Sequence, residues 1–354
     1  MSAVSKNKKY LELDGVRVSY RAKDNTIHIT SVDEDLGGMP FHLTLGNRSE
    51  SEQVLRDLLT EKGLIREREQ PALIPESAVF DWAENFESAG YFPLGVAAND
   101  ETVFWNPEKN SHMLIAGGSG QGKSVLLRNI FYHCMAHNRR WDFYGIDLRV
   151  VEFAPFKKYK NTVQRIASTF EDALEVLLEV RTVLNTRLAQ MSAEKVQSYS
   201  KISGPKGKNI LLAIDEANVL LAMPVPKDAD DVLVSQIEQI RQAFIGLLRQ
   251  GRAANIFVIV SSQRPDATII TDSHKAYLET RVVAGRMDAT PSTMVLRNSK
   301  AVTLPKIRGR GIISVKGEQK EFQIFMSQDE QAIEWIREYG TILEPELYGQ
   351  LNQL

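Results

Sequence analysis

The pattern best suited to chemistry is the run Gly117-Gly118-Ser119-Gly120-Gln121-Gly122-Lys123-Ser124. It fits G-x-x-x-x-G-K-[ST], with an apolar stretch before it and a helix-forming stretch after it. Glycines allow backbone N–H groups to curl around nucleotide phosphates, whereas larger residues would obstruct them. Lys123 would reach the terminal phosphates, and the Ser124 hydroxyl would hold Mg²⁺. We therefore expect a nucleotide site that extends to Val125; the alternative is a glycine-rich connection with a solvated lysine.

A second pattern supplies the acidic groups. The apolar run 209–214 ends in Asp215 and Glu216. Opposite a glycine loop, Asp215 would orient Mg²⁺ and its waters, and Glu216 would polarise the water that attacks the γ-phosphate. The expected cofactors are therefore ATP and Mg²⁺, the expected metal ligands are Ser124 and Asp215, and the expected reaction is hydrolysis.

Two further polar residues lie near another apolar run, 256–260. Gln263 follows this run, at the strand end where open α/β sheets place ligands, and could contact the γ-phosphate or the attacking water. Arg252 precedes the run and could reach the ATP of a neighbouring subunit as an arginine finger. The alternatives are a turn glutamine and a helix-end arginine that complements the helix dipole.

The composition is typical of a globular protein, with 43% apolar and 25% charged residues among 354. No stretch approaches the roughly 18 uninterrupted apolar residues of a membrane span, and the first residues do not form a secretory signal. The single cysteine, Cys134, excludes an internal disulfide and favours a cytoplasmic location. The net charge of −2 gives no global attraction to nucleic acid, so DNA contacts would come from local patches or a ring lumen.

The chain divides into a small and a large part on its pattern. Residues 1–70 are expected to form a small N-terminal α/β accessory domain, with a hairpin over 16–20 and 27–30, a strand over 41–45 and a helix that begins at Ser49. A linker over 71–91 and a C-terminal tail over 341–354 would flank a nucleotide-binding domain over 92–340. In that domain we expect an α/β fold with a parallel sheet flanked by helices. Its expected strands are 112–116, 142–146, 210–214, 256–260 and 281–284, and its long helices 172–191 and 231–250.

These segments together resemble the FtsK/SpoIIIE family of DNA translocases. The matching residues are Leu94-Gly95, 112–117, the glycine loop, Ile146-Asp147-Leu148-Arg149, Asp215-Glu216, Gly251-Arg252-Ala253-Ala254 and Ser261-Ser262-Gln263-Arg264-Pro265. The resemblance covers about residues 92–335. It departs from the family pattern at Asn255, which replaces a glycine, and at Leu148-Arg149, which replaces a Pro-Lys pair.

The resemblance implies a RecA-like P-loop ATPase core in a homohexameric ring that pulls double-stranded DNA. It assigns Arg252 as the trans-acting finger and Gln263 as the sensor of hydrolysis. A short motor without a membrane anchor or a winged-helix domain is similar to conjugative coupling ATPases, plasmid transfer proteins and phage-encoded translocases. Its N-terminal domain would dock a relaxase, a membrane channel protein or neighbouring subunits, and a partner could recruit it to the membrane.

Three basic stretches are candidates for DNA contacts. They are 201–208 with Lys206 and Lys208, 306–311 with Lys306, Arg308 and Arg310, and 157–160; the Arg308–Arg310 loop is the favoured one. Such contacts would be independent of sequence and sensitive to salt; the alternative is solvated surface charge. A zinc site at His133, Cys134 and His137 is not expected, because no further ligand lies at suitable spacing. The rival functions are a protein-secretion ATPase of the same fold and a nucleotide-gated adaptor that hydrolyses little.

Overall fold

The computed structural model describes residues 73–80, 90–157, 159, 162–226, 228–263, 265, 271–326 and 329–339, together with four strands before residue 45. The chain divides into two compact units, residues 1–72 and residues 73–354. Within the described residues, no helix is both long enough and apolar enough to span a bilayer.

The first unit contains an antiparallel sheet in the order β1-β2-β3-β4. Its strands are β1 (Lys9–Leu13), β2 (Val16–Lys23), β3 (Thr26–Val32) and β4 (Phe41–Thr44). β2 and β3 form the expected hairpin, and β4 is the expected third strand. β1 was not expected from the sequence. The helix expected from Ser49 lies outside the described residues.

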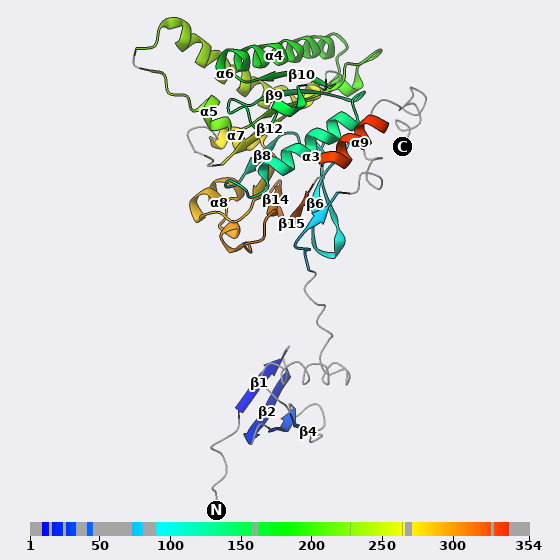
Figure 1. Ribbon diagram of the computed structural model, residues 1–354, viewed down its shortest axis with the longest axis vertical. Coiled ribbons are helices and arrows are strands. Elements are labelled where there is room, and N and C mark those ends of the chain that lie inside the picture. The colour runs from blue at the N-terminus through cyan, green and yellow to red at the C-terminus, as the bar shows by residue number, and fades with distance from the viewer. Residues whose placement is uncertain are drawn as a thin grey trace, which may run out of the picture. The chain divides into compact units, whose positions relative to one another are not determined.

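The second unit is built on one large sheet (Figure 1). Its described strands are β5 (Ala78–Val79), β6 (Phe92–Val96), β7 (Thr102–Trp105), β8 (Met113–Ala116), β9 (Trp141–Ile146), β10 (Val163–Ala167), β11 (Asn209–Ile214), β12 (Ile256–Ser262), β13 (Thr280–Ala284), β14 (Arg310–Val315) and β15 (Glu318–Met326). Their order is β10-β9-β11-β12-β8-β13-β14-β15-β6-β7, with β5 beside β15.

The sheet is parallel in one half and antiparallel in the other. Neighbouring strands run parallel from β10 to β13, and this half contains the five strands expected from the sequence. The neighbouring pairs from β13 to β7 are antiparallel. The expectation of a parallel sheet is therefore correct for the half that carries the glycine loop, and the antiparallel extension is an addition to it.

Helices cover both faces of this sheet. They are α3 (Lys123–Ala136), α4 (Phe170–Ala193), α5 (Ala217–Leu221), α6 (Asp231–Gln250), α7 (Asp272–Tyr277), α8 (Ala289–Leu296) and α9 (Asp329–Tyr339). α3 and α9 lie together on one side of the sheet, and α4 and α6 pack together on the other (Figure 1). Successive residues of a strand point to opposite faces, so Leu114 of β8 packs with α4 and α6, whereas Ile115 packs with α3.

The two long helices begin close to where the sequence predicts. The Thr169 hydroxyl accepts a hydrogen bond from the Asp172 N–H at the start of α4, and the Asp230 carboxylate accepts one from the Leu233 N–H at the start of α6. Each cap satisfies a backbone donor that would otherwise lack an intrahelical partner. The apolar stripes of both helices lie in the core, as expected.

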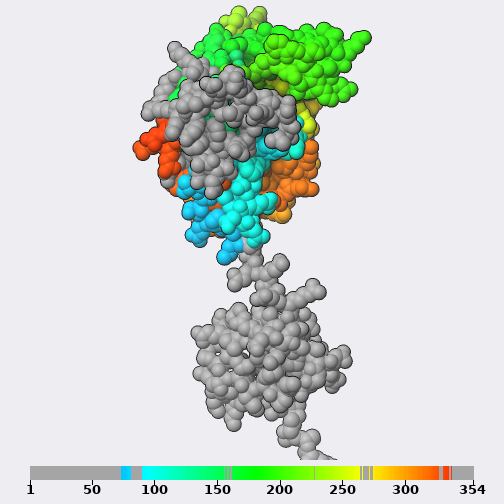
Figure 2. Space-filling model, turned by 90° about the vertical axis from the view of Figure 1, so that its right-hand side faces the viewer, coloured from blue at the N-terminus to red at the C-terminus, as the bar shows by residue number. Residues whose placement is uncertain are grey.

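The segment 73–80, here called the connecting segment, is fixed to the sheet by a buried arginine. Arg310 is 5% exposed. Its Nη2 donates to the carbonyl oxygens of Ile74 and Pro75 at 3.1 and 2.9 Å, and its Nη1 donates to Glu321 at 3.0 Å. Figure 2 shows the connecting segment in blue beside β6 and β7 in cyan. The pairing of a buried charge with several acceptors keeps the segment against β15, because an unpaired guanidinium in the core would be costly.

His112, just before β8, connects three elements in the core. Its Nδ1 accepts a hydrogen bond from the Val258 N–H of β12 at 2.9 Å, and its Nε2 lies 3.1 Å from the Leu248 carbonyl oxygen of α6. This geometry requires the neutral ring with its proton on Nε2. Burial lowers the pKa of His112 to about 4; the Arg252 charge lowers it further, whereas the bond to Leu248 raises it.

This pKa predicts an acid-sensitive contribution to stability. Between pH 6.5, the ordinary value, and about 4 the unfolded chain binds a proton that folded His112 does not. The free energy of unfolding should therefore fall as pH falls through this window, by up to about 3 kcal/mol from this residue. A His112→Gln variant should be less stable at pH 8 yet lose less stability towards pH 4.5. Urea unfolding at several pH values measures this, and equal pH dependence in both proteins would contradict it.

Candidate active site

The glycine loop lies between β8 and α3, as the sequence predicts. The Gly117 N–H donates to the Ser262 carbonyl oxygen at 3.2 Å, and a Cβ at Gly117 would meet the Ala284 carbonyl oxygen at 2.3 Å. The loop therefore passes too close to β13 for any side chain at this position. Gly122 has φ of +112° and precedes α3, a conformation that favours glycine. The first backbone N–H groups of α3 are then available to an anion.

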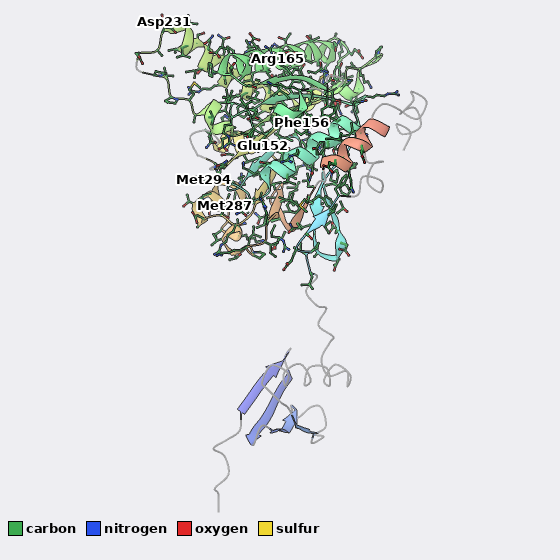
Figure 3. All side chains as sticks on the ribbon, viewed as in Figure 1. Glu152, Phe156, Arg165, Asp231, Met287 and Met294 are labelled. Atoms are coloured by element: carbon green, nitrogen blue, oxygen red, sulfur yellow. The ribbon has the colours of Figure 1, made fainter. Side chains whose placement is uncertain are left out.

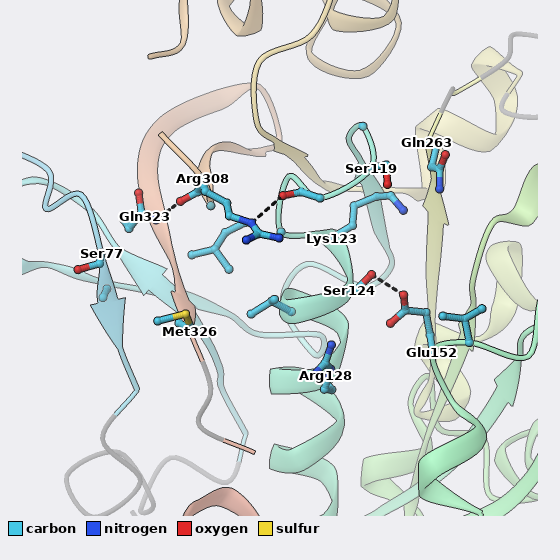
Figure 4. A pocket seen from close by; sticks show the side chains of 18 of the residues that line it. Ser77, Ser119, Lys123, Ser124, Arg128, Glu152, Gln263, Arg308, Gln323 and Met326 are labelled. Carbon is cyan, nitrogen blue, oxygen red and sulfur yellow. Dashed lines mark hydrogen bonds between the residues drawn. The ribbon is translucent and has the colours of Figure 1, made fainter. Parts of the chain in front are cut away.

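A cavity of about 1260 Å³ opens beside this loop. Its wall includes Gly118, Ser119, Gly120, Gly122, Lys123, Ser124 and Val125 from the predicted nucleotide-binding residues, together with Gln263. Figure 4 shows Lys123, Ser124 and Gln263 around the same space. The opposite wall comes from the connecting segment through Ser77 and Ala78 and from β15 through Ile324 and Met326.

The predicted carboxylates lie at the carboxyl end of β11, next to the carboxyl end of β12. Ser261 of β12 joins them, because its hydroxyl donates to Asp215 at 2.5 Å and accepts from the Glu216 N–H at 3.3 Å. The Glu216 carboxylate accepts the Gln263 N–H at 3.1 Å. The structure thus brings Asp215, Glu216 and Gln263 together, and the β11–β12 pairing holds them in register.

Arg149 and Glu152, like Ser261, were not assigned by sequence reasoning, and they lie beside this cluster. The Arg149 Nη2 lies 3.2 Å from Asp215 Oδ2 and 3.4 Å from Glu216 Oε2. The Ser124 hydroxyl donates to Glu152 Oε1 at 2.5 Å, which Figure 4 marks as a dashed line. Both residues follow β9, the strand next to β11. The matching segment 146–149 was the only sequence signal near them, and it did not indicate which partners they contact.

Burial and charge act in opposite directions on Arg149. Partial burial lowers its pKa, but the hydrogen bond to Asp215 and the charges of Asp215, Glu216 and Asp147 raise it more. The net result is a pKa above the ordinary value, so the guanidinium stays charged at any pH at which the protein is folded. The cluster therefore has a permanent cation beside its two predicted catalytic acids.

The side chains present fit a nucleotide with a magnesium ion. Backbone N–H groups of the loop, Lys123 and Arg149 supply donors and positive charge for phosphate oxygens. Hydroxyl and carboxylate oxygens are the ligands that Mg²⁺ prefers, and the Ser124 hydroxyl and the carboxylates of Glu152 and Asp215 supply them here. An ATP analogue also has room beyond the phosphates, where the connecting segment and β15 form the far wall.

Arg252 lies away from this cluster. It begins a short 3₁₀ helix, η5 (Arg252–Ala254), before β12, whereas the glycine loop follows the parallel strand β8. Arg252 therefore lies at the amino-terminal ends of the parallel strands, and the glycine loop lies at their carboxyl ends. The Arg252 side chain is 47% exposed and pairs with Glu279 at 3.3 Å. This position does not bring Arg252 to the nucleotide cavity of its own chain.

The five basic candidates for DNA contacts occupy different places. Lys206 donates to the Ser200 carbonyl oxygen and Lys208 pairs with Asp142, both before β11. Lys306 is exposed, whereas Arg308 donates to the Gly120 carbonyl oxygen at 3.1 Å and lines the nucleotide cavity. Arg310 is held inside the fold by the connecting segment. Its burial argues against the DNA contact expected for it, because the guanidinium would have to abandon four acceptors.

Comparison with known sequences gives a family match. The sequence pattern of the FtsK/SpoIIIE family matches residues 80–267. The DNA translocase FtsK of Streptococcus pneumoniae is 26% identical over 245 residues, which cover 65% of this chain and 30% of that protein. The DNA translocase FtsK of Bacillus cereus is 23% identical over 256 residues, which cover 70% of this chain and 31% of that protein. The chain thus spans about a third of the length of these curated relatives.

Solved structures share the fold. The conjugation coupling protein TcpA of pCW3, in its monomer form with ATPγS, aligns with a TM-score of 0.66 at 22% identity and covers 93% of this chain and 92% of its own. EssC (ATPases 2 and 3) from Geobacillus thermodenitrificans aligns with a TM-score of 0.60 at 17% identity, with coverage of 79% and 54%. The cytoplasmic domain of the type VII secretion ATPase EccC of Thermomonospora curvata aligns with a TM-score of 0.54 at 18% identity. The alignment covers 76% of this chain and 32% of that chain.

These likenesses confirm the expected α/β P-loop ATPase fold, in which a large sheet is flanked by helices. The family match covers the glycine loop and Gln263, which line the cavity, and the carboxylates after β11, which contact the cavity residue Arg149. The resemblance inferred from the sequence is therefore confirmed, and this chain belongs to the FtsK/SpoIIIE family.

Proposed function

We propose that this protein is a DNA translocase that hydrolyses ATP in the cavity beside its glycine loop. The proposal rests on one observation. At the carboxyl ends of the parallel strands, Lys123 and Gln263 line the cavity, and Gln263 bonds Glu216, which follows Asp215. A site that only binds nucleotide does not need an acid positioned for water activation. The family match adds support, since the two relatives described above are DNA translocases.

Each residue has a role that its position supports. Lys123 and the loop N–H groups would bind the phosphates and offset the charge that develops on them. Glu216 would accept a proton from the attacking water, and Gln263, fixed beside it, would orient that water. Ser124 and Asp215 would hold Mg²⁺, with Glu152 close enough to contribute through one of its waters. A bound Mg²⁺ would supply charge neutralisation on the phosphate oxygens.

The position of Arg252 supports hydrolysis shared between subunits. It lies at the end of the parallel strands opposite to the nucleotide cavity of its own chain. Its side chain is half-exposed and pairs with Glu279. From that position Arg252 could act only on ATP that is bound to a neighbouring copy. We therefore propose that the copies form a ring, a homohexamer. We further propose a cytoplasmic motor whose residues 1–70 dock a relaxase, a membrane channel protein or a neighbouring subunit.

Double-stranded DNA is the proposed cargo. The exposed candidates for contact are Lys206 and Lys306, with the half-buried Lys208 beside Lys206, and they would bind phosphates without reading sequence. The likeness to TcpA, a conjugation coupling protein, favours plasmid or other mobile-element DNA. The alternative is protein cargo, which the shared fold with EssC and a secretion ATPase keeps open.

Removing the lysine of the glycine loop tests hydrolysis. Lys123→Ala should lower ATP turnover about 100-fold or more, because transition-state charge on the phosphates loses its nearest cation. A colorimetric phosphate-release assay measures turnover, and circular dichroism checks that the variant is folded. Turnover within a fewfold of wild type would exclude this cavity as the site of hydrolysis.

Mixing variants tests the trans role of Arg252. Arg252→Ala should bind ATP with near wild-type affinity yet lose turnover about 1000-fold, the scale of an arginine finger. Mixing it with Lys123→Ala should restore part of the turnover, because an intact cavity then meets an intact arginine. Arg249→Ala, an exposed arginine in the last turn of α6, is the control and should keep full turnover. A mixture as inactive as its parts would contradict the trans role.

Added DNA separates the two cargo hypotheses. ATP turnover should rise when long duplex DNA is added, and the rise should weaken as salt increases, since phosphate contacts release counterions. Lys306→Ala should flatten the salt dependence by about one unit of log slope. A turnover rate indifferent to duplex DNA at low salt would contradict DNA cargo and favour the secretion alternative.

A further inference from the structure

Arg149 lines the nucleotide cavity, as Arg128 and Arg308 do, and it also contacts both predicted catalytic acids. It follows β9, and 38% of its side chain is exposed. Its contacts with Asp215 and Glu216 both involve the same nitrogen, Nη2. Within the described part of the chain, its Nε and Nη1 make no hydrogen bond or ion pair. A planar guanidinium with donors left over beside a phosphate-binding loop can accept a further anion.

The backbone around Arg149 is fixed by a buried aspartate. Asp147 is 1% exposed, and its Oδ2 accepts the N–H groups of Val151, Glu152 and Phe153 at 2.9, 2.7 and 3.1 Å. Its Oδ1 accepts the Arg149 N–H at 3.2 Å. This network folds residues 147–153 into a tight turn at the edge of the cavity. Arg149 and Glu152 are therefore presented from one rigid support, which lowers the entropic cost of binding.

The charges around the cavity define what Arg149 can recognise. Glu152 lines the cavity, and Asp215 and Glu216 contact Arg149, whereas Lys123, Arg128 and Arg308 line the cavity with positive charge. A terminal phosphate near Ser124 would stand close to these carboxylates, and Arg149 together with the proposed Mg²⁺ would offset the repulsion between them. The glycine loop would bind the α- and β-phosphates, which a triphosphate and a diphosphate share, and Lys123 would reach the β- and γ-phosphates. Arg149 comes from a different strand, next to the predicted catalytic acids.

We propose that Arg149 binds the terminal phosphate of ATP bound to its own chain, and so discriminates nucleoside triphosphate from diphosphate. This inference rests on the proposed ATP site. Arg149 keeps its contact with the two acids through Nη2 and offers its remaining donors to the γ-phosphate. It thereby links the presence of that phosphate to the position of Glu216, which Gln263 also contacts.

Nucleotide affinity tests this role without any need for turnover. Calorimetric titration of the full chain with ATPγS and with ADP, each with Mg²⁺, gives the ratio of the two dissociation constants. The wild-type protein should bind ATPγS more tightly than ADP. Arg149→Ala should lower that preference about tenfold or more, the scale of a charge-assisted hydrogen bond, while the affinity for ADP changes little. An unchanged ratio in Arg149→Ala would overturn the proposal.

Arg165 provides a matched control. Its side chain is 37% exposed and pairs with Asp172 and Glu175, so it resembles Arg149 in exposure and in charge environment. Figure 3 places Arg165 near α4, whereas Glu152 lies nearer α3 and the glycine loop. Arg165→Ala should keep the wild-type ratio. A loss of discrimination equal to that of Arg149→Ala would show a general charge effect and would also overturn the proposal.

The Arg149→Ala change is also made in a protein that carries Glu216→Gln. This double variant separates binding of the phosphate by Arg149 from neutralisation of the Glu216 charge. If Arg149 only offset that carboxylate, its removal would have no effect on the ratio once Glu216 is replaced by glutamine. We expect the loss of discrimination to persist in the Glu216→Gln background, and its disappearance there would contradict a direct contact. Failure of wild type to bind either nucleotide would remove the proposed function and this inference together, whereas binding with an unchanged ratio would remove the inference alone.

Discussion

The structure depends on the parallel alignment of β8, β12 and β11. Parallel strands end at the same edge of a sheet, so the glycine loop after β8, Gln263 after β12 and Asp215 after β11 meet there. The Ser261 hydroxyl, which bonds Asp215 and the Glu216 N–H, joins two of these strands at their ends. A slip of one residue in the β11–β12 register would turn these side chains to the other face of the sheet.

The antiparallel half of the sheet forms the cavity wall opposite the glycine loop, through residues of β15. Gln323 of β15 accepts a hydrogen bond from Arg310 Nε and donates to the Arg308 carbonyl oxygen, and Arg308 in turn donates to Gly120. Arg310 holds the connecting segment through Ile74 and Pro75. The phosphate loop is therefore linked, through a chain of side-chain and backbone hydrogen bonds, to the connecting segment.

Much of the site could be predicted from the sequence because its signals are local. The glycine spacing, the apolar run before Asp215 and Glu216 and the helix stripes of α4 and α6 each depend on neighbours in the chain. Arg149, Glu152 and Ser261 were not assigned because their partners lie 66, 28 and 46 residues away. The inward turn of Arg310 had no local signal either, since a basic residue in a glycine-rich stretch ordinarily indicates solvated charge. The antiparallel extension likewise depends on pairings that only the folded chain reveals.

The central claim is that ATP hydrolysis at this cavity moves duplex DNA. Displacement of a third strand from a defined triplex on a long duplex measures such movement directly. The account predicts displacement that requires ATP, is absent with ATPγS and fails in Glu216→Gln. Active hydrolysis in the presence of duplex DNA without any displacement of the third strand would contradict it.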